Sequence, residues 1–169
     1  MSYRIESIAR GHIEGYWRAL DSVARERRYL AFLEAPPVAR VRRFALDNIR
    51  AGHAHYIAMH EDEVVGWCDV VPKDRPALQH TGVLGIGIVA EHRGKGLGAH
   101  LIGATIDGAR RKGLTRIELT VRTDNPRAQR LYERAGFVTE GRIRRHMKIG
   151  DDYFDSLLMG LLVEPTKGA

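Results

Sequence analysis

The sequence of 169 residues contains one cysteine, few aromatic residues and no long apolar run. A single cysteine, Cys68, excludes an internal disulfide and any metal cluster built from cysteines. No stretch approaches the 18 consecutive apolar residues that a membrane-spanning helix requires. The first six residues lack the apolar core of a secretion signal. We therefore expect a cytoplasmic protein with no metal site and no membrane partner.

Positive charge is in excess, with 27 Lys and Arg residues against 21 Asp and Glu residues. A basic surface attracts nucleic acids, anionic membranes and anionic ligands alike. Aromatic residues make up only 7% of the chain and are not interleaved with the basic runs. A nucleic-acid partner is therefore not expected. An anionic ligand and a generally basic, solvated surface both remain open.

Apolar periodicity predicts one α/β domain over residues 1–169, without repeats or low-complexity linkers. The expected order of strands and helices is βααβββαβαββ, which favours a mixed sheet with helices on both faces. The strands are expected at residues 3–9, 55–59, 64–71, 81–89, 116–121, 137–142 and 153–163, and the helices at residues 13–32, 38–49, 97–109 and 126–135.

A glycine-rich turn lies between an apolar strand and a helix, at residues 93–98, which read RGKGLG. Glycine lets a ligand approach the backbone closely. The first turn of a helix offers unpaired N–H groups and the positive end of the helix dipole. Two cations, Arg93 and Lys95, lie among the glycines. The turn therefore predicts a binding site for the phosphates of a cofactor.

Two other phosphate-binding motifs fit the sequence less well. A P-loop needs G-x-x-x-x-G-K-[ST], but Val89 stands at its first glycine and Gly96 at its Ser/Thr position. Residues 85–90 match a dinucleotide fingerprint, but this match lies inside the expected strand. Arg110 also stands where the acidic residue of that fingerprint would be expected. Both nucleotide classes are therefore disfavoured.

A second block supports a different cofactor. The expected strand 116–121 is followed by a helix whose start, face and end carry Asn125, Ala128, Tyr132, Gly136 and Phe137. Together with residues 93–98, this layout resembles the GNAT superfamily of N-acetyltransferases over nearly the whole chain. Residues 140–155 are similar to the branch that acetylates small-molecule amines and amino acids.

The resemblance implies a single acetyltransferase domain with a mixed, mostly antiparallel sheet of about seven strands and about four helices. It also implies that the central strand splays away from its neighbour, and that acetyl-CoA lies in the gap as cosubstrate. The residues that would bind acetyl-CoA are Ile88, Val89, Arg93, Gly94, Lys95, Gly96, Gly98, Ala99, Asn125 and Tyr132.

The implied reaction is direct attack of a primary amine on the thioester, with a backbone N–H near Val89 stabilising the developing oxyanion. Tyr132 stands at the position of the family's general acid, and a phenol with a pKa of about 10 can protonate an alkyl thiolate. Cys68 lies within a strand, away from any helix N-terminus or base. We therefore expect a core thiol at this position and not a nucleophile.

The general base is less clearly indicated. Many members of the superfamily carry an acidic residue on the central strand, at the position that Gly85 occupies here. This departure argues against a carboxylate at that position. Glu118, on the neighbouring strand, is the expected catalytic base. Ordered water is an alternative, and so are His53, His55 and His80, because the ordinary pKa of histidine suits proton transfer near neutral pH.

In the superfamily, the first two helices and the late hairpin select the acceptor, here residues 29–41 and 142–154. Both regions are rich in arginine, which favours an acceptor with a carboxylate or phosphate, such as an amino acid. The arginines concerned are Arg40 with Arg42 and Arg43, which directly follow the first region, and Arg142, Arg144 and Arg145. The alternatives are a peptide N-terminus, a protein lysine and a non-catalytic acyl-CoA-binding module. A homodimer is compatible with the sequence.

Overall fold

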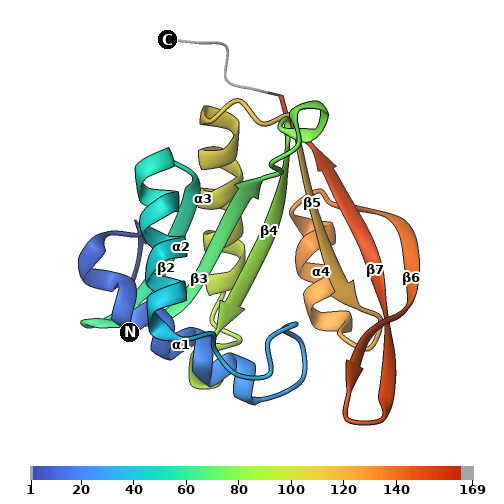
Figure 1. Ribbon diagram of the computed structural model, residues 1–169, viewed down its shortest axis with the longest axis horizontal. Helices are drawn as coiled ribbons and strands as arrows, with labels where there is room; N and C mark the ends of the chain where they lie inside the picture. The colour runs from blue at the N-terminus through green and yellow to red at the C-terminus, as the bar shows by residue number, and fades with distance from the viewer. Residues whose placement is uncertain (1, 165–169) are drawn as a thin grey trace.

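The computed structural model describes residues 2–164, which form a seven-stranded sheet and four α-helices (Figure 1). The expected α/β fold, with its number of strands and helices, is confirmed. The strands are β1 (Tyr3–Ser7), β2 (Ala54–His60), β3 (Glu63–Pro72), β4 (Thr81–Ile88), β5 (Arg116–Arg122), β6 (Val138–Ile149) and β7 (Asp152–Leu162). The helices are α1 (Ile13–Arg25), α2 (Val38–Ala51), α3 (Leu97–Arg111) and α4 (Pro126–Arg134).

The strands lie in the order β1-β2-β3-β4-β5-β7-β6, and every neighbouring pair is antiparallel except β4 and β5. This parallel pair is short, because residues 81–83 of β4 pair with residues 116–118 of β5 and the ladder then ends. Figure 1 shows the two strands diverging beyond this point. The sheet therefore consists of two halves, β1–β4 and β5–β7–β6, which confirms the expected splay.

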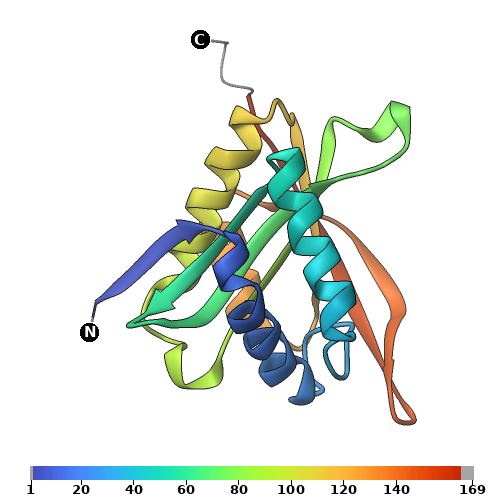
Figure 2. The same cartoon turned by 60° about the vertical axis from the view of Figure 1, so that its left-hand side comes forward.

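Helices α1 and α2 pack on one face of the first half (Figure 2). Helix α1 buries Ile13, Tyr16, Leu20 and Val23, whose spacing places them on one side of a helix. Helix α3 packs on the opposite face of this half, and α4 belongs to the same apolar cluster as α3 and β7. Among the described residues, no helix combines the length and the apolar composition needed to cross a membrane.

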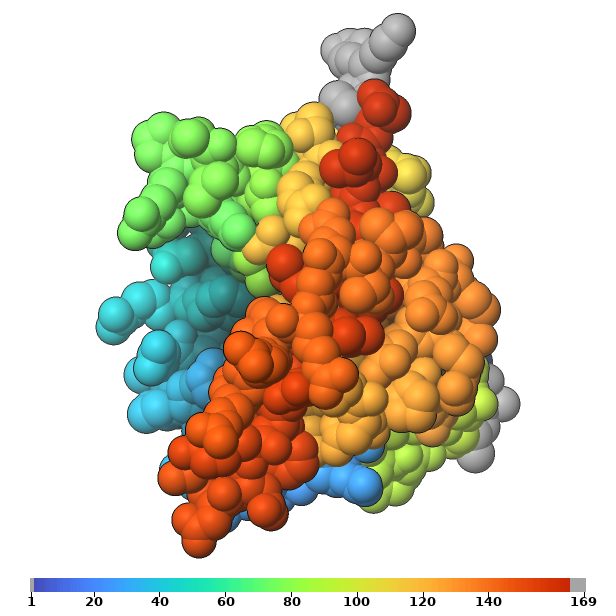
Figure 3. All heavy atoms as spheres, turned by 90° about the vertical axis from the view of Figure 1, so that its right-hand side faces the viewer, coloured from blue at the N-terminus to red at the C-terminus, as the bar shows by residue number. Residues whose placement is uncertain are grey.

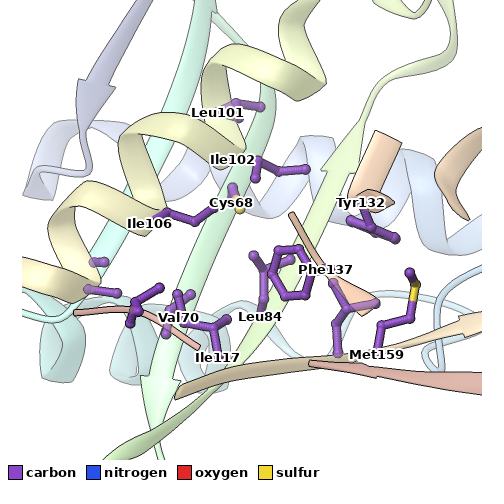
Figure 4. Packing of buried hydrophobic residues seen from close by; sticks show 14 of the residues in the cluster. Cys68, Val70, Leu84, Leu101, Ile102, Ile106, Ile117, Tyr132, Phe137 and Met159 are labelled. Carbon is purple, nitrogen blue, oxygen red and sulfur yellow. The ribbon is translucent and has the colours of Figure 1, made fainter. Parts of the chain in front are cut away.

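One apolar cluster crosses the gap between the two halves of the sheet. Leu84 of β4 and Tyr132 of α4 belong to it, together with Phe137 and with Met159 of β7 (Figure 4). Burying a large apolar side chain stabilises a fold by roughly 1.5–3 kcal/mol. Side-chain packing therefore joins the halves where the hydrogen-bonded ladder does not.

The helix expected at residues 13–32 ends at Arg25, so this prediction was too long. Arg27 has a left-handed backbone with φ of 51°. The Asp21 carboxylate accepts hydrogen bonds from Arg25 Nε at 2.7 Å and from the Ala35 N–H at 2.9 Å. These bonds fold the following residues back along α1 as a loop. The apolar residues Leu30 and Phe32 lie in this loop, and their presence in the sequence made the helix look longer than it is.

The late hairpin is also longer than expected. The sequence predicts its first strand at residues 137–142, but β6 continues to Ile149 and turns at Gly150, where φ is 60°. Its register with β7 shifts between Ile143 and Met147, so the alternation that marks a strand is interrupted. Figure 3 shows the hairpin covering one side of the molecule, with its tip extending beyond the body.

Candidate active site

A cavity of about 1120 Å³ opens where β4 and β5 diverge. Both halves of the sheet contribute to its walls through β3, β4 and β5. Helices on both faces of the sheet also contribute, namely α1, α2 and α4. Residues 93–94, residues 96–99 and α4 line it on one side of the sheet, and α1, residues 28–32 and α2 line it on the other side, called the far end below. Such a volume slightly exceeds the usual range of small-molecule sites.

The glycine-rich turn at residues 93–98 contributes to the wall of this cavity. Gly94 and Gly96 have left-handed backbones with φ of 80° and 83°, which side chains disfavour. Gly96 is also the N-cap of α3. A Cβ at Gly98 would lie only 2.8 Å from Leu131 Cδ2, so α4 packs directly against this residue. Gly94, Gly96, Gly98 and Ala99 all line the cavity.

Arg93 is held by partners within the protein. Its Nη1 donates to Glu26 Oε2 at 2.9 Å, and its Nε donates to the Ile88 carbonyl at 2.7 Å. The guanidinium lines the cavity, but these contacts fix it to the end of α1 and to β4. Arg93 therefore ties the glycine-rich turn to both elements, a role that the phosphate-binding expectation did not include.

Lys95 lies outside the main cavity. Its Nζ donates to the Glu91 carbonyl at 3.0 Å, and its side chain lines a smaller pocket with Tyr3. Two arginines of α4, Arg127 and Arg134, line the main cavity instead. Neither was among the expected cofactor residues. Their separation of seven residues, which places both on one side of a helix that follows the motif, is the signal that identifies them.

The backbone of β4 corrects the expectation for Val89. The Val89 N–H donates to the Val65 carbonyl at 2.9 Å, and Val89 is not among the residues that line the cavity. In an antiparallel ladder, hydrogen bonding alternates along the strand. The N–H groups of Ile86 and Ile88 therefore point towards β5, where the described ladder has already ended. These two N–H groups, and not that of Val89, face the gap.

Helix α4 brings Asn125 and Tyr132 to the cavity. Asn125 caps the helix, because its Oδ1 accepts a hydrogen bond from the Ala128 N–H at 3.2 Å. Tyr132 is buried, and its ring centroid lies 6.0 Å from that of Phe137. Burial raises the pKa of Tyr132 above its ordinary value. The phenol therefore stays protonated and keeps a proton to donate.

None of the expected general bases is among the residues that line the cavity. Glu118 forms ion pairs with Lys73 Nζ at 2.5 Å and with Arg116 Nε at 3.5 Å. Its carboxylate is thus directed to these cations and not to the gap. The candidate histidines also lie outside the walls: His53, His55 and His80.

A different carboxyl group does line the cavity. Asp69 of β3 is only 7% exposed and is paired across the strands with Gly85 of β4. Burial raises the pKa of Asp69 to about 7. Asp69 was not a sequence candidate, although a single carboxylate inside the apolar run VVGWCDVV is a signal that could have identified it.

The far end of the cavity is apolar with a basic edge. Tyr29, Phe32 and Phe44 line it and remain partly exposed. Of the six arginines expected to contact an acceptor, Arg40 is the member that lines the cavity. Arg142, in contrast, is paired with Asp155, with 2.9 Å from its Nε to Oδ2.

Arg122 braces the same end of the cavity. Its Nε donates to Asp124 Oδ1 at 2.8 Å, and its Nη1 donates to the Arg28 carbonyl. Its guanidinium carbon lies 3.5 Å from the centroid of the Phe154 ring. Arg122 therefore connects β5 with the loop after α1 and with the late hairpin.

Cys68 is fully buried, and burial raises the pKa of its thiol, as expected for a core residue. Its carbonyl accepts a hydrogen bond from Thr105 of α3. Within residues 2–164, no group of three or more His, Cys, Asp or Glu side chains is placed to hold a metal ion.

Solved structures share this architecture closely. The putative acetyltransferase yncA from Salmonella typhimurium, solved with acetyl-CoA, superposes with a TM-score of 0.91 over 99% of this chain and 98% of that one. A phosphinothricin acetyltransferase from Sinorhizobium meliloti in complex with acetyl-CoA gives 0.90 over 99% and 95%. Identities of 15% and 16% make these likenesses of fold alone.

Sequence relatives agree with the fold. The L-amino acid N-acetyltransferase AaaT of Escherichia coli is 28% identical over 65% of this chain and 68% of its own length. N-alpha-acetyltransferase 30 of Schizosaccharomyces pombe is 36% identical over 43% of this chain. The chain spans about half the length of that protein (49%) and of YycN from Bacillus subtilis (54%).

A sequence model of the acetyltransferase (GNAT) family matches residues 16–137, which include β2 to β5, the glycine-rich turn and α4. This match covers well over half of the chain. The chain therefore belongs to the GNAT acetyltransferase family.

Proposed function

We propose that this protein transfers the acetyl group of acetyl-CoA to the primary amine of a small molecule, with Tyr132 as general acid. One observation carries this proposal. The cavity at the splayed β4–β5 junction has the glycine-rich turn at one end, an apolar wall at the other and Tyr132 on α4 between the two halves of the sheet.

The residues at the turn fit acetyl-CoA. The glycines give the backbone the left-handed turn at the start of α3, and Arg127 Nη2 lies 3.3 Å from where a Cβ of Gly94 would be. This combination suits a pyrophosphate. The N–H groups of Ile86 and Ile88, which face the gap, suit the amides of an extended pantetheine arm.

Acetyl-CoA supplies the reactive thioester when it is bound. The protein contributes orientation in the gap, and an N–H of β4 at Ile86 or Ile88 stabilises the negative charge that develops on the thioester oxygen. The phenol of Tyr132 gives its proton to the departing sulfur. The surrounding apolar residues exclude water, which strengthens both interactions.

The acceptor end favours an amine that carries both an apolar group and an acidic group. Its aromatic wall suits an apolar side chain, and Arg40 suits a carboxylate. A relative with matching preference supports this assignment. The L-methionine sulfoximine/L-methionine sulfone acetyltransferase of Pseudomonas aeruginosa is 28% identical over 79% of this chain and 80% of its own length. We therefore place free amino acids first among the acceptors.

A peptide N-terminus is the second candidate acceptor. The similarity to N-alpha-acetyltransferase 30 supports it, as does the partial exposure of Tyr29, Phe32 and Phe44 at the far end of the cavity. A peptide would extend past these residues into solvent, whereas a free amino acid would end against Arg40. The two acceptor classes therefore differ in whether a carboxylate must lie close to the reacting amine, where it can pair with Arg40.

Thiol release from acetyl-CoA tests the proposal directly, with free amino acids, their primary amides, polyamines and short peptides as acceptors. We expect apolar amino acids to react fastest and their amides to react more slowly, because amides cannot pair with Arg40. Exclusive turnover of peptides would establish the second candidate. Acetyl-CoA binding without turnover of any amine would instead indicate an acyl-CoA-binding module and contradict the proposal.

Replacing Tyr132 by phenylalanine is expected to lower kcat by roughly 10²–10⁴-fold, the range for loss of a general acid. The phenyl ring keeps the contact with Phe137, so the dissociation constant of acetyl-CoA stays close to that of the wild type. The matched control is Tyr56→Phe, which removes a hydroxyl on β2 that accepts a hydrogen bond from Arg111 outside the cavity, and which leaves kcat unchanged. Equal kcat values for the wild type and Tyr132→Phe would remove Tyr132 from the mechanism.

A further inference from the structure

Transfer to an amine requires a base that Tyr132 does not supply. An aliphatic amine is an ammonium ion at neutral pH, and its nitrogen has no lone pair until a proton leaves. That base must lie at the acceptor end of the cavity, within hydrogen-bond reach of the bound amine. Glu118 does not meet this requirement, because it pairs with Lys73 and Arg116 away from the cavity.

Asp69 meets the geometric requirement because of its partner in the sheet. It is paired with Gly85, and cross-strand partners project on the same face of a sheet. A Cβ at Gly85 would lie 3.5 Å from Asp69 Oδ1 and 3.8 Å from Oδ2. The absence of a side chain at Gly85 therefore leaves the Asp69 carboxyl group uncovered above the strand that borders the gap.

The neighbouring pair of strand residues shows the same arrangement. A Cβ at Gly87 would lie 2.2 Å from the Trp67 indole, so Trp67 occupies the space above Gly87. Side chains of β3 thus cover β4 at two successive positions of the same face. At residue 87 the covering group is an apolar ring, and at residue 85 it is a carboxyl group that borders the cavity.

Asp69 also has no internal partner. Within the described residues, no hydrogen bond or ion pair engages its carboxyl group, and burial alone accounts for its altered pKa. A buried carboxyl group without a partner is costly to a fold. A ligand with a positive charge would satisfy it, and the ammonium group of the acceptor carries that charge into the cavity.

We propose that Asp69 is the general base of the amine transfer proposed above and binds the acceptor's ammonium group before deprotonating it. Asp69 thereby takes from β3 the position that Gly85 leaves empty on β4. This assignment rests on the proposed function. Asp69 is then a catalytic residue of that reaction, because its carboxylate contacts the reacting nitrogen.

The proton balance requires two transfers from nitrogen. The ammonium group gives one proton to Asp69, and the neutral amine then forms the C–N bond to the thioester carbon. As the C–S bond breaks, the sulfur takes a proton from Tyr132, and the nitrogen's second proton restores the phenol. The products are an amide and a free thiol, and Asp69 releases its proton to solvent.

The groups that face Asp69 set its titration. Tyr16 of α1 and the cross-strand partner His55 of β2 lie on the same face, and both are buried. His55 is uncharged near neutrality, because burial lowers its pKa to about 4, and burial raises the pKa of Tyr16. The cations that line the cavity wall at this end are Arg28, Arg40 and Arg122, of which Arg122 is paired with Asp124.

A carboxyl group with a raised pKa of about 7 is half ionised near neutral pH. In the wild type, kcat/KM should therefore rise with pH through an apparent pKa near 7 and then level off. Only the ionised carboxylate of Asp69 accepts a proton, so kcat/KM increases, and does not decrease, as pH rises through this pKa. The neutral amide of Asp69→Asn should abolish this rise of kcat/KM near pH 7.

The decisive experiment compares Asp69→Asn with the wild type on two classes of acceptor. With an amine that is protonated at pH 7.5, kcat should fall by roughly 10²–10³-fold, while acetyl-CoA affinity stays constant. With a weakly basic amine that is already neutral, such as an alkoxyamine, the loss should shrink to a few fold. An equal loss with both classes, or a pH limb near 7 that persists in Asp69→Asn, would overturn the assignment.

A second variant moves the carboxylate instead of removing it. Asp69→Ala should be nearly inactive, and Asp69→Ala combined with Gly85→Asp should recover part of the lost kcat, because the two side chains share the same space. No recovery in a double variant that binds acetyl-CoA normally would count against the proposal. Failure of the wild type to acetylate any amine would contradict the proposed function itself, a separate outcome.

Discussion

The Gly96→Glu variant is expected to bind acetyl-CoA at least roughly 100-fold more weakly than the wild type, a loss of about 2.7 kcal/mol. Gly96 caps α3 with a left-handed φ of 83°. Glutamate is strained in that conformation, and its carboxylate would lie beside the expected pyrophosphate. Isothermal titration calorimetry with acetyl-CoA measures the effect without any acceptor.

Two matched variants separate charge from backbone strain. Gly113→Glu makes the same change at the other end of α3, where φ is 86° and a Cβ meets nothing within 4 Å. It should keep full affinity for acetyl-CoA, because Gly113 does not line the cavity. Gly96→Ala adds strain without charge and should lose only a few fold. Normal affinity in Gly96→Glu would disprove the assignment of the glycine-rich turn.

Asp69→Asn is expected to stabilise the fold above pH 7 while it removes activity. The folded protein raises the pKa of Asp69 to about 7 from an ordinary value of 3.8. As pH rises between these values, the unfolded chain loses this proton first, so the free energy of unfolding falls. Asparagine does not titrate. We expect a gain of about 2–4 kcal/mol above pH 7, or roughly 5–15 °C in Tm, which vanishes near pH 4.

Thermal unfolding of both proteins between pH 4 and pH 8 checks this expectation. Asp155→Asn provides a control of opposite sign, because the Arg145 N–H and Arg142 hold the pKa of Asp155 below its ordinary value. That variant should be less stable than the wild type at neutral pH. A pH-independent difference between wild type and Asp69→Asn would show that Asp69 does not titrate in the folded protein between pH 4 and pH 7.

The local parts of the fold were predictable from the sequence. Strand and helix order followed from apolar periodicity, and the position of the glycine-rich turn followed from its residues alone. The chain at residues 26–37 did not, because its path depends on Asp21 binding the distant Ala35 N–H and on Trp17 Nε1 donating to the Pro36 carbonyl. Such bonds leave no periodic trace in the sequence.

The candidate site divides in the same way. Tyr132, Asn125 and the glycines were identified from motifs that are contiguous in sequence. Asp69 was not, because the apolar run around it marks only a buried carboxyl group, and its place beside the gap depends on its register with Gly85, sixteen residues further along the chain. Glu118 had the required chemistry, but its contacts with Lys73 and Arg116 became visible only in three dimensions.

The division of the sheet has a consequence for how precisely the two proposed catalytic groups, Asp69 and Tyr132, can be aligned. Asp69 belongs to the half formed by β1–β4, whereas Tyr132 packs on the half formed by β5–β7–β6. The ladder between β4 and β5 stops at residue 83, so no continuous rigid scaffold sets the distance from proton acceptor to proton donor. The interlocking side chains of Leu84, Phe137 and Met159 set that distance instead. The alignment of the two proposed catalytic groups is thus a property of the hydrophobic core as much as of the cavity.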